Sequence, residues 1–230
     1  MPGLVARRQR VYSNSGNAPL IELLDKGCRR VLDVGCGAGD GAALVKRANP
    51  ECRVFGITHS IQEARLAQAH MEHCWVLDIE GEFPVELASL SFDALIFSHV
   101  LEHLREPDAV LARFADLLCS GGQFIIAVPN VVFWRHRFKF LLGRFEYDPA
   151  GGALDDTHLR FFTYFTSDRY LLSLSPQLEI RFKGVTGSVP LWWLRRRVLP
   201  EAWCERIDGW GSLRWPNLFG YQVLIEGLKR

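Results

Sequence analysis

The chain has 230 residues, of which 48% are hydrophobic and 23% charged, and its formal net charge is +1 at pH 7. This composition is typical of a water-soluble protein with enough apolar material for one large core. A near-neutral charge gives no general attraction to nucleic acid, so we expect no such partner. No apolar run approaches the ~20 residues that cross a bilayer, and the N-terminus lacks the apolar region of a secretory signal. We therefore expect a cytoplasmic protein whose six cysteines are reduced thiols.

Strand-like and helix-like segments alternate along most of the chain. Short apolar runs predict strands at residues 30–34, 52–57, 74–77, 92–98, 121–128, 178–185 and 219–227. Helical spacing or helix-start signals predict helices at residues 39–48, 60–70 and 107–118. Ser60 with Glu63 has the pattern of a capping box, and Pro107 suits a first helical position. Buried strands separated by helices indicate a doubly wound α/β sheet covered on both faces.

The segment RRVLDVGCGAGD, residues 29–40, joins the first predicted strand to the first predicted helix through three glycines. In open α/β sheets, ligands bind at this kind of turn, at the carboxyl ends of the strands. A dinucleotide fingerprint would read G-x-G-x-x-G, with an acid ~20 residues later for the ribose. Here the spacing is G-x-G-x-G, and Asp33 precedes the glycines. An acid aimed at the turn suits an amino-acid ammonium, which favours S-adenosylmethionine over NAD. The alternative is a turn that binds no ligand.

This segment resembles the first motif of the class I S-adenosylmethionine-dependent methyltransferases. The resemblance continues through SFDALIFSHVLEHLREPDAVLARFADLLCSGGQFIIAVPN (residues 91–130) and through LLGRFEYDPAGGALDDTHLRFFT (residues 141–163), a block similar to bacterial small-molecule and glycan-type members. It implies a Rossmann-like, doubly wound sheet of seven strands, mostly parallel with an antiparallel last strand. It also implies a single methyltransferase domain over residues 1–230, with substrate-covering insertions at residues 130–165 and 188–217.

The same resemblance implies a set of residues around the cofactor S-adenosylmethionine. Asp33, Gly35, Cys36 and Gly37 would hold its methionine end. Thr58 stands where the family has an acid for the ribose, so a weaker contact from Thr58, His59 or Ser60 is expected. The remaining positions are Asp78 and the Ile79 backbone N–H at the adenine, Ser98 and His99 beneath the sulfonium, and Tyr12 covering the pocket.

Three histidines are candidate catalytic bases for an acceptor that must lose a proton. His99 and His103 follow the strand that ends at the cofactor, and His158 lies in LDDTHLRFF, where Asp155 or Asp156 could orient it. Two structural alternatives remain open. Asp155, Thr157 and Arg160 could tie down a loop, and Glu102 with His103 could cap a turn. His99 and His103 also have i, i+4 spacing, but no third ligand is obvious, so no metal site is expected.

Residues 188–217 contain five of the seven tryptophans and five arginines. They could form a lid over an apolar acceptor, or a membrane-surface patch with Arg195, Arg196 and Arg197 facing anionic lipid. A dimer contact or a second small core over the sheet are further alternatives, and we expect a monomer or a homodimer. The basic, aromatic stretch at residues 134–144 is expected to be an amphipathic helix over the active site.

Together these features predict an S-adenosylmethionine-dependent methyltransferase with a small-molecule, glycan or lipid-linked acceptor, methylated at oxygen. A non-catalytic protein that binds S-adenosylmethionine is the alternative. A third possibility, an NAD-linked oxidoreductase, would change the fluorescence of added NADH.

Overall fold

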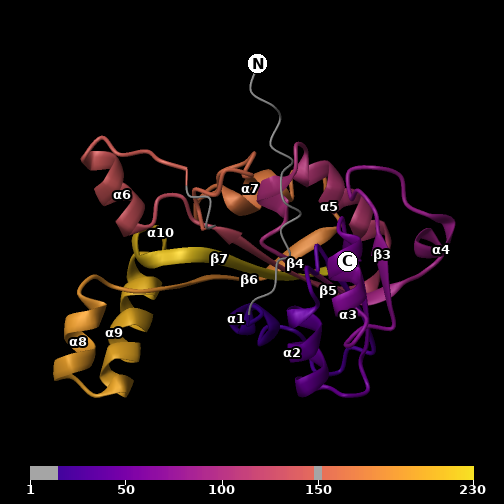
Figure 1. The fold of residues 1–230 in the computed structure, drawn as a ribbon, viewed down its shortest axis with the longest axis horizontal. Helices are drawn as coiled ribbons and strands as arrows, with labels where there is room; N and C mark the ends of the chain where they lie inside the picture. The colour runs from indigo at the N-terminus through magenta and orange to yellow at the C-terminus, as the bar shows by residue number, and fades with distance from the viewer. Residues whose placement is uncertain (1–14, 148–151) are drawn as a thin grey trace.

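Seven strands form one sheet in the order β3-β2-β1-β4-β5-β7-β6 (Figure 1). The computed structural model describes residues 15–147 and 152–230, so Tyr12 lies outside the described residues. The strands are β1 (Arg30–Val34), β2 (Arg53–Thr58), β3 (His73–Val76), β4 (Phe92–Ser98), β5 (Leu118–Pro129), β6 (Leu178–Gly187) and β7 (Gly220–Lys229). β7 pairs antiparallel with both β5 and β6, and the other pairings are parallel. The predicted α/β sheet with an antiparallel last strand is confirmed.

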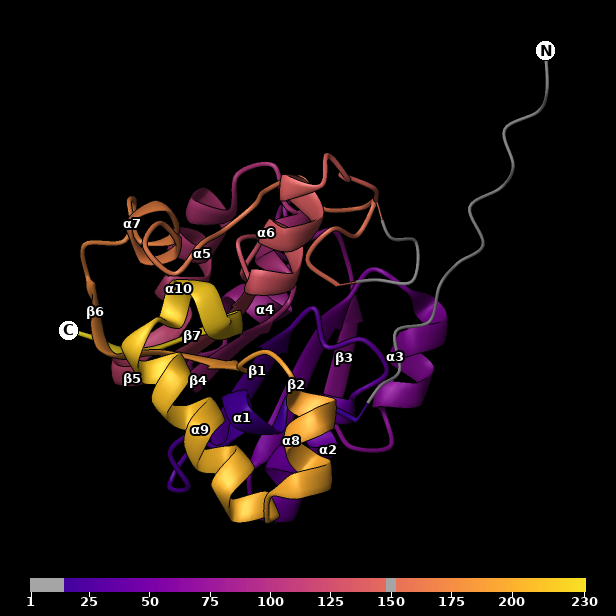
Figure 2. The ribbon, with the colours of Figure 1, turned by 90° about the vertical axis from the view of Figure 1, so that its left-hand side faces the viewer.

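Helices cover both faces of the sheet (Figures 1 and 2). One face carries α1 (Ala18–Ile21), α2 (Asp40–Ala48) and α3 (Ile61–Ala67), and the other carries α4 (Val85–Ala88), α5 (Pro107–Asp116) and α7 (Ser167–Leu171). Successive strand residues belong to opposite cores: Val31 packs with α1 and α2, whereas Leu32 packs with α4 and α5. Both side chains are fully buried. This two-sided burial explains why the strands appear in the sequence as continuous apolar runs.

The helix that follows β1 begins at a glycine with a left-handed backbone. Gly39 is the N-cap of α2 and has φ of 90°. A Cβ atom at this position would lie 2.8 Å from the Cα of Ala67 at the end of α3. Glycine therefore permits both the turn and the close approach of α2 to α3.

We expect Gly39→Ala to lower the free energy of unfolding by about 2–4 kcal/mol, because backbone strain of roughly 1–3 kcal/mol adds to the overlap with Ala67. Gly121→Ala is the matched control, since Gly121 has φ of 74° but a Cβ atom there would meet no other atom within 4 Å. Chemical denaturation of both variants measures the difference. Equal losses would show that backbone conformation alone, and not the contact between α2 and α3, requires glycine at residue 39.

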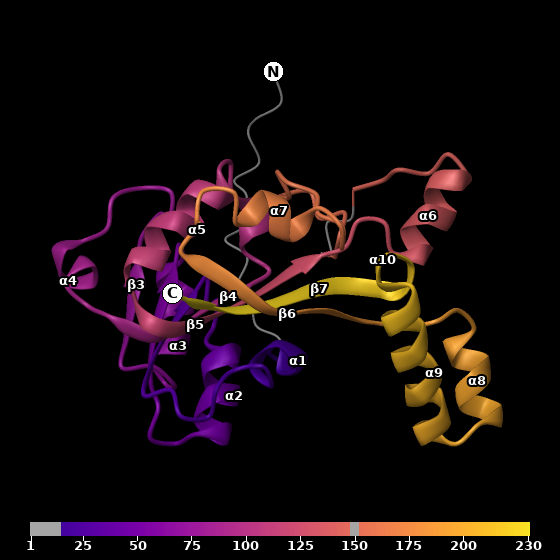
Figure 3. The ribbon, with the colours of Figure 1, turned by 180° about the vertical axis from the view of Figure 1, so that it is seen from behind.

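Several helices that follow β5 and β6 lie outside the two packed layers. α6 (Trp134–Leu141) has no buried residue, while α8 (Trp192–Val198) and α9 (Glu201–Arg214) form a pair that projects beyond the sheet, followed by α10 (Pro216–Phe219) (Figure 3). The Trp134 indole N–H donates to the Ser188 carbonyl at 2.9 Å, which joins α6 to the start of the segment at residues 188–217. An ion pair of 2.6 Å between Arg195 and Asp208 joins α8 to α9.

The tryptophans of this segment do not fill a second core. Trp192, Trp193, Trp203, Trp210 and Trp215 are 41–60% exposed. That alternative from the sequence is therefore wrong. α8 and α9 extend past the end of β6 and the start of β7, where no opposing layer of the described residues covers them. All six cysteines are free thiols, as expected. Within residues 15–147 and 152–230, no helix combines the length and the apolar character that a membrane span requires.

Candidate cofactor and active site

The glycine turn and the loop after β4 meet at the carboxyl ends of two central strands. β1 and β4 are neighbours, but the chain continues from β1 to β2 on one side and from β4 to β5 on the other. This is the topological switch point at which open α/β sheets bind ligands. The two loops are in contact, because a Cβ atom on Gly35 would lie 2.5 Å from Val100. The sheet thus brings the predicted cofactor and catalytic segments to one place.

The glycine turn is held by backbone hydrogen bonds in a conformation that suits glycine. Gly35 and Gly37 have φ of 76° and 51°. The N–H groups of Gly35 and Cys36 both donate to the Ile57 carbonyl at 2.9 Å, which ties the turn to the end of β2. The turn therefore has a defined shape with no side chain on its two glycines, as a cradle for the methionine end of the cofactor requires.

Asp33 is 3% exposed, and its carboxylate faces the first turn of α2. A Cβ atom on Gly41 would lie 2.8 Å from Asp33 Oδ2, so Gly41 gives the carboxylate its space. Burial raises the pKa of Asp33 from 3.8 to about 7. A buried carboxylate with a raised pKa is stabilised by a nearby cation, so the site fits the ammonium group of S-adenosylmethionine.

The hydroxyl of Thr58 is engaged within the protein. It donates to the Glu63 carboxylate and accepts from the Ser60 N–H at 3.2 Å. Only half of the predicted capping box forms: Ser60 Oγ accepts from the Glu63 N–H at 3.4 Å, but the Glu63 side chain contacts Thr58. The capping pattern does not reveal that the Glu63 carboxylate, which is 1% exposed, reaches from α3 to the end of β2. His59 is exposed.

The predicted adenine end lies after β3. Asp78 is exposed, and its Oδ1 accepts from the Glu80 N–H at 2.9 Å, whereas Ile79 is 9% exposed. Arg113 donates to the Ile79 and Gly81 carbonyls and holds this loop in place. An open hollow beside it is lined by Asp78, Glu80, Gly81, Arg105, Glu106 and Arg160.

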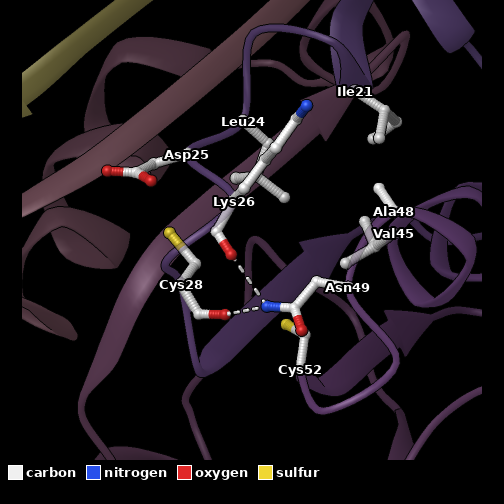
Figure 4. A pocket seen from close by; sticks show the side chains of 9 residues that line it. All are labelled: Ile21, Leu24, Asp25, Lys26, Cys28, Val45, Ala48, Asn49 and Cys52. Atoms are coloured by element: carbon white, nitrogen blue, oxygen red, sulfur yellow. Dashed lines mark hydrogen bonds between the residues drawn. The ribbon is translucent and has the colours of Figure 1, made fainter.

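A smaller cavity lies at the opposite end of the strands, near the amino ends of β1 and β2 (Figure 4). It has a volume of about 20 Å³ between α1, α2 and the amino ends of β1 and β2, which is room for one water molecule. Asn49 Nδ2 donates to the Lys26 and Cys28 carbonyls at 3.0 Å and links these segments. This cavity is structural and separate from the cofactor site.

At the end of β4, His99 lies between two hydrogen-bond acceptors. Its Nε2 is 2.7 Å from Gln222 Oε1, and its Nδ1 is 3.3 Å from Glu102 Oε1. Burial lowers the pKa of His99, but Glu102 and Gln222 outweigh this and raise it above 6.5. Ser98 Oγ accepts from Asn17 at 3.4 Å beside this group. A histidine whose two nitrogens both face acceptors suits charge balance more than proton removal.

Asp155 orients His103. Asp155 Oδ1 accepts from the Thr157 hydroxyl at 2.6 Å and from the Thr157 N–H at 2.8 Å. Because the Thr157 hydroxyl proton goes to Asp155, Thr157 Oγ1 accepts from His103 Nδ1 at 2.9 Å. In this arrangement Nε2 of His103 carries the lone pair. The sequence predicted that Asp155 or Asp156 would orient His158, whereas this relay leads from Asp155 to His103.

His158 lies against His103 and the buried carboxylate of Glu102. The two imidazole rings are 4.7 Å apart, and the His158 side chain is 5% exposed. His158 Nδ1 is 3.3 Å from the Ala153 carbonyl, and its Nε2 is 3.9 Å from Glu102 Oε1. Burial and His103 lower the pKa of His158 below 6.5 despite Glu102. His158 is therefore neutral at pH 7.

The structure thus gathers all three candidate histidines around Glu102, a residue that the sequence placed only in a turn cap. Glu102 lies in a 3-10 turn, η1 (Leu101–His103), and is 1% exposed. Its carbonyl accepts from the N–H groups of Leu159 and Arg160 at 2.9 and 3.0 Å. One ligand atom from each of Glu102, His103 and His158 lies within 4.8 Å of the others, so these residues could hold a metal ion.

Comparisons with known proteins show the family to which the chain belongs. A family model described as a methyltransferase domain matches residues 6–171. A ubiquinone biosynthesis O-methyltransferase of Paracidovorax citrulli is 33% identical over 119 residues, which cover 50% of this chain and 48% of that protein. A ubiquinone/menaquinone biosynthesis C-methyltransferase of Desulfotalea psychrophila is 31% identical over 127 residues, covering 52% and 51%. The chain spans about half the length of these curated relatives.

Among solved structures, a SAM dependent methyltransferase from Archaeoglobus fulgidus superposes with a TM-score of 0.58 at 22% identity. The superposition covers 92% of this chain and 89% of that one, and it shows that the fold is shared. The family match extends over most of the chain and includes the glycine turn, the loop after β4 and the segment that carries His158. The family predicted from the sequence, with its cofactor, is thereby confirmed. The chain belongs to the methyltransferase-domain family of S-adenosylmethionine-dependent enzymes.

Proposed function

We propose that the chain transfers a methyl group from S-adenosylmethionine to a hydroxyl oxygen of a small-molecule, glycan or lipid-linked acceptor. When bound, S-adenosylmethionine supplies an electrophilic methyl group on a positively charged sulfur. Asp33 would hold its ammonium group, and the turn at residues 35–37 would hold its methionine chain. The acceptor oxygen would take this methyl group in a direct displacement that leaves the electron pair of the sulfur–carbon bond on sulfur. The hydroxyl proton leaves to the protein or to solvent.

The observation that carries this proposal is the cluster of Glu102, His103 and His158 at the carboxyl end of β4. A neutral hydroxyl is a weak nucleophile, so oxygen methylation benefits from a group that removes the proton or stabilises the oxygen anion. The relay from Asp155 through Thr157 leaves a lone pair on His103 Nε2. One of the relatives is named as an O-methyltransferase, which supports an oxygen acceptor.

An apolar or lipid-linked acceptor is supported by the exposed aromatic side chains of α8 and α9. Trp193, Trp203 and Trp210 are 57–60% exposed, and the guanidinium groups of Arg197 and Arg206 lie over Trp193 and Trp203. Tryptophan with arginine suits the boundary between an apolar phase and anionic head groups. Membrane contact through α8 and α9 is therefore part of this proposal.

The test is transfer of a labelled methyl group from S-adenosylmethionine to acceptors that span these classes. The panel contains phenols, sugars and lipid-linked hydroxyl compounds, with matched acceptors whose hydroxyl is replaced by hydrogen. We expect label in a methyl ether of one class and none in its deoxy partner. Label on carbon or nitrogen would contradict the choice of oxygen. Cofactor binding without transfer to any acceptor would favour the non-catalytic alternative.

A further inference from the structure

We propose that Glu102, His103 and His158 bind one divalent transition-metal ion, such as Zn²⁺, which activates the acceptor hydroxyl. The proposal rests on the proposed function only for the role of the ion, and the binding site stands on the geometry of this chain. The sequence alone did not predict it, because His158 comes from a distant segment that the fold brings against η1.

The two histidines are oriented so that unprotonated nitrogens remain for a ligand. His158 Nδ1 faces the Ala153 carbonyl, which can only accept, so Nδ1 carries the proton and Nε2 carries the lone pair. His103 Nδ1 likewise faces Thr157 Oγ1 and the Thr157 carbonyl, at 2.9 and 3.4 Å. Histidines that bind metals characteristically donate their other ring N–H to a carbonyl or to a carboxylate-linked group. Both histidines have this arrangement.

The buried carboxylate of Glu102 has one close polar neighbour, the His99 ring, and no partner with hydrogen-bond geometry among the described residues. Neither of its oxygens accepts a hydrogen bond from the described residues, although the side chain is 1% exposed. Its Oε1 lies 3.9 Å from His158 Nε2, a distance too long for a hydrogen bond. Two electron-pair donors that face each other in a buried site repel unless a cation lies between them. His99, 3.3 Å from Oε1, offers a single contact at the edge of this group.

The donor set indicates the class of metal. Two imidazoles and one carboxylate suit Zn²⁺ and similar transition ions, whereas Mg²⁺ prefers oxygen ligands. Three protein ligands leave a coordination position open, as catalytic metal sites do. An acceptor hydroxyl bound there would lose its proton to solvent near neutral pH, because the ion stabilises the oxygen anion. The ion would thus prepare the acceptor oxygen for the methyl transfer proposed above.

The experiment titrates the full chain, freed of metal with a chelator, with Zn²⁺ by calorimetry and with Co²⁺ by visible absorption. We expect one ion per chain and Co²⁺ bands of a nitrogen and oxygen site. Glu102→Gln and His103→Ala should each weaken Zn²⁺ binding at least ~100-fold, and Thr157→Val, which removes the support of His103, should weaken it about 10–100-fold. His70→Asn removes an exposed histidine outside the cluster and should change nothing.

Circular dichroism of each variant establishes that it is folded. An intense Co²⁺–thiolate band would assign the metal to Cys36 and Cys74, whose sulfurs are 3.6 Å apart, and would overturn the proposal. Failure of Zn²⁺ to bind, or binding that survives Glu102→Gln combined with His103→Ala, would also overturn it. Methyl transfer is measured separately with and without chelator. Methyl transfer that persists in a metal-free protein would support the proposed function and contradict a role for the ion. Metal binding without oxygen methylation would support the metal site and contradict the proposed function.

Discussion

Asp33→Asn should stabilise the ligand-free protein and, at the same time, weaken its binding of S-adenosylmethionine. Burial raises the pKa of Asp33 to about 7, so the folded state holds this proton more tightly than the unfolded chain does. Its contribution to stability is present below pH 3.8 and is lost as the pH rises to about 7. At pH 8 the buried charge costs the fold roughly 4 kcal/mol relative to its protonated form. The neutral amide avoids part of this cost.

The same substitution removes the charge that we assign to the ammonium of the cofactor. A lost charged hydrogen bond of about 1–3 kcal/mol weakens binding roughly 5–150-fold. Thermal denaturation and calorimetry at pH 8 measure the two effects. The affinity of the wild-type protein for S-adenosylmethionine should also fall as the pH drops below 7, since Asp33 takes up its proton. The affinity of Asp33→Asn should not change with pH in this range, because the amide does not titrate. Unchanged affinity in the variant would place the ammonium elsewhere.

His103→Ala should reduce turnover by about 100-fold or more and leave the affinity for S-adenosylmethionine unchanged. In the proposed mechanism the imidazole acts only where the acceptor loses its proton, whereas the glycine turn after β1 would hold the cofactor. Single-turnover transfer of a labelled methyl group measures the chemical step, and calorimetry measures cofactor binding.

His158→Ala should show a loss of the same order, because both histidines belong to the cluster that we propose to activate the acceptor. His70→Asn serves as the control for loss of a histidine at the surface. Normal turnover in both His103→Ala and His158→Ala would contradict the catalytic role and indicate that the two residues only hold residues 152–165 against η1.

The sheet could be predicted from the sequence because its strands are covered on both faces. β1 and β4 begin and end where their apolar runs do, at residues 30–34 and 92–98. The observed strand boundaries differ from the predicted ones where the backbone pairing extends beyond the buried side chains. β5 begins at Leu118, ahead of the predicted residue 121, because Gly121 and Gly122 continue the strand past a register shift beside Phe92.

The candidate site could be predicted only where it is local in sequence. The turn at residues 33–39 is one continuous motif, so its residue types and spacing were sufficient to predict a tight glycine turn after β1. The relay is different, because Thr157 lies 54 positions after His103 and their contact depends on packing between segments. Glu63 shows a second limit: the pattern of a capping box describes its backbone N–H correctly but says nothing of where its carboxylate goes.

The backbone contact between η1 and residues 159–160 has a consequence for how acceptor choice can change. The carbonyl of Glu102 holds the end of the segment at residues 152–160, and this segment carries Asp155, Thr157 and His158. Exchanging this segment for the matching segment of another enzyme would replace Thr157 and His158, two of the residues proposed to activate the acceptor, in a single step. The choice of acceptor and the groups that activate it would then change together, while the segments proposed to bind the cofactor stayed the same.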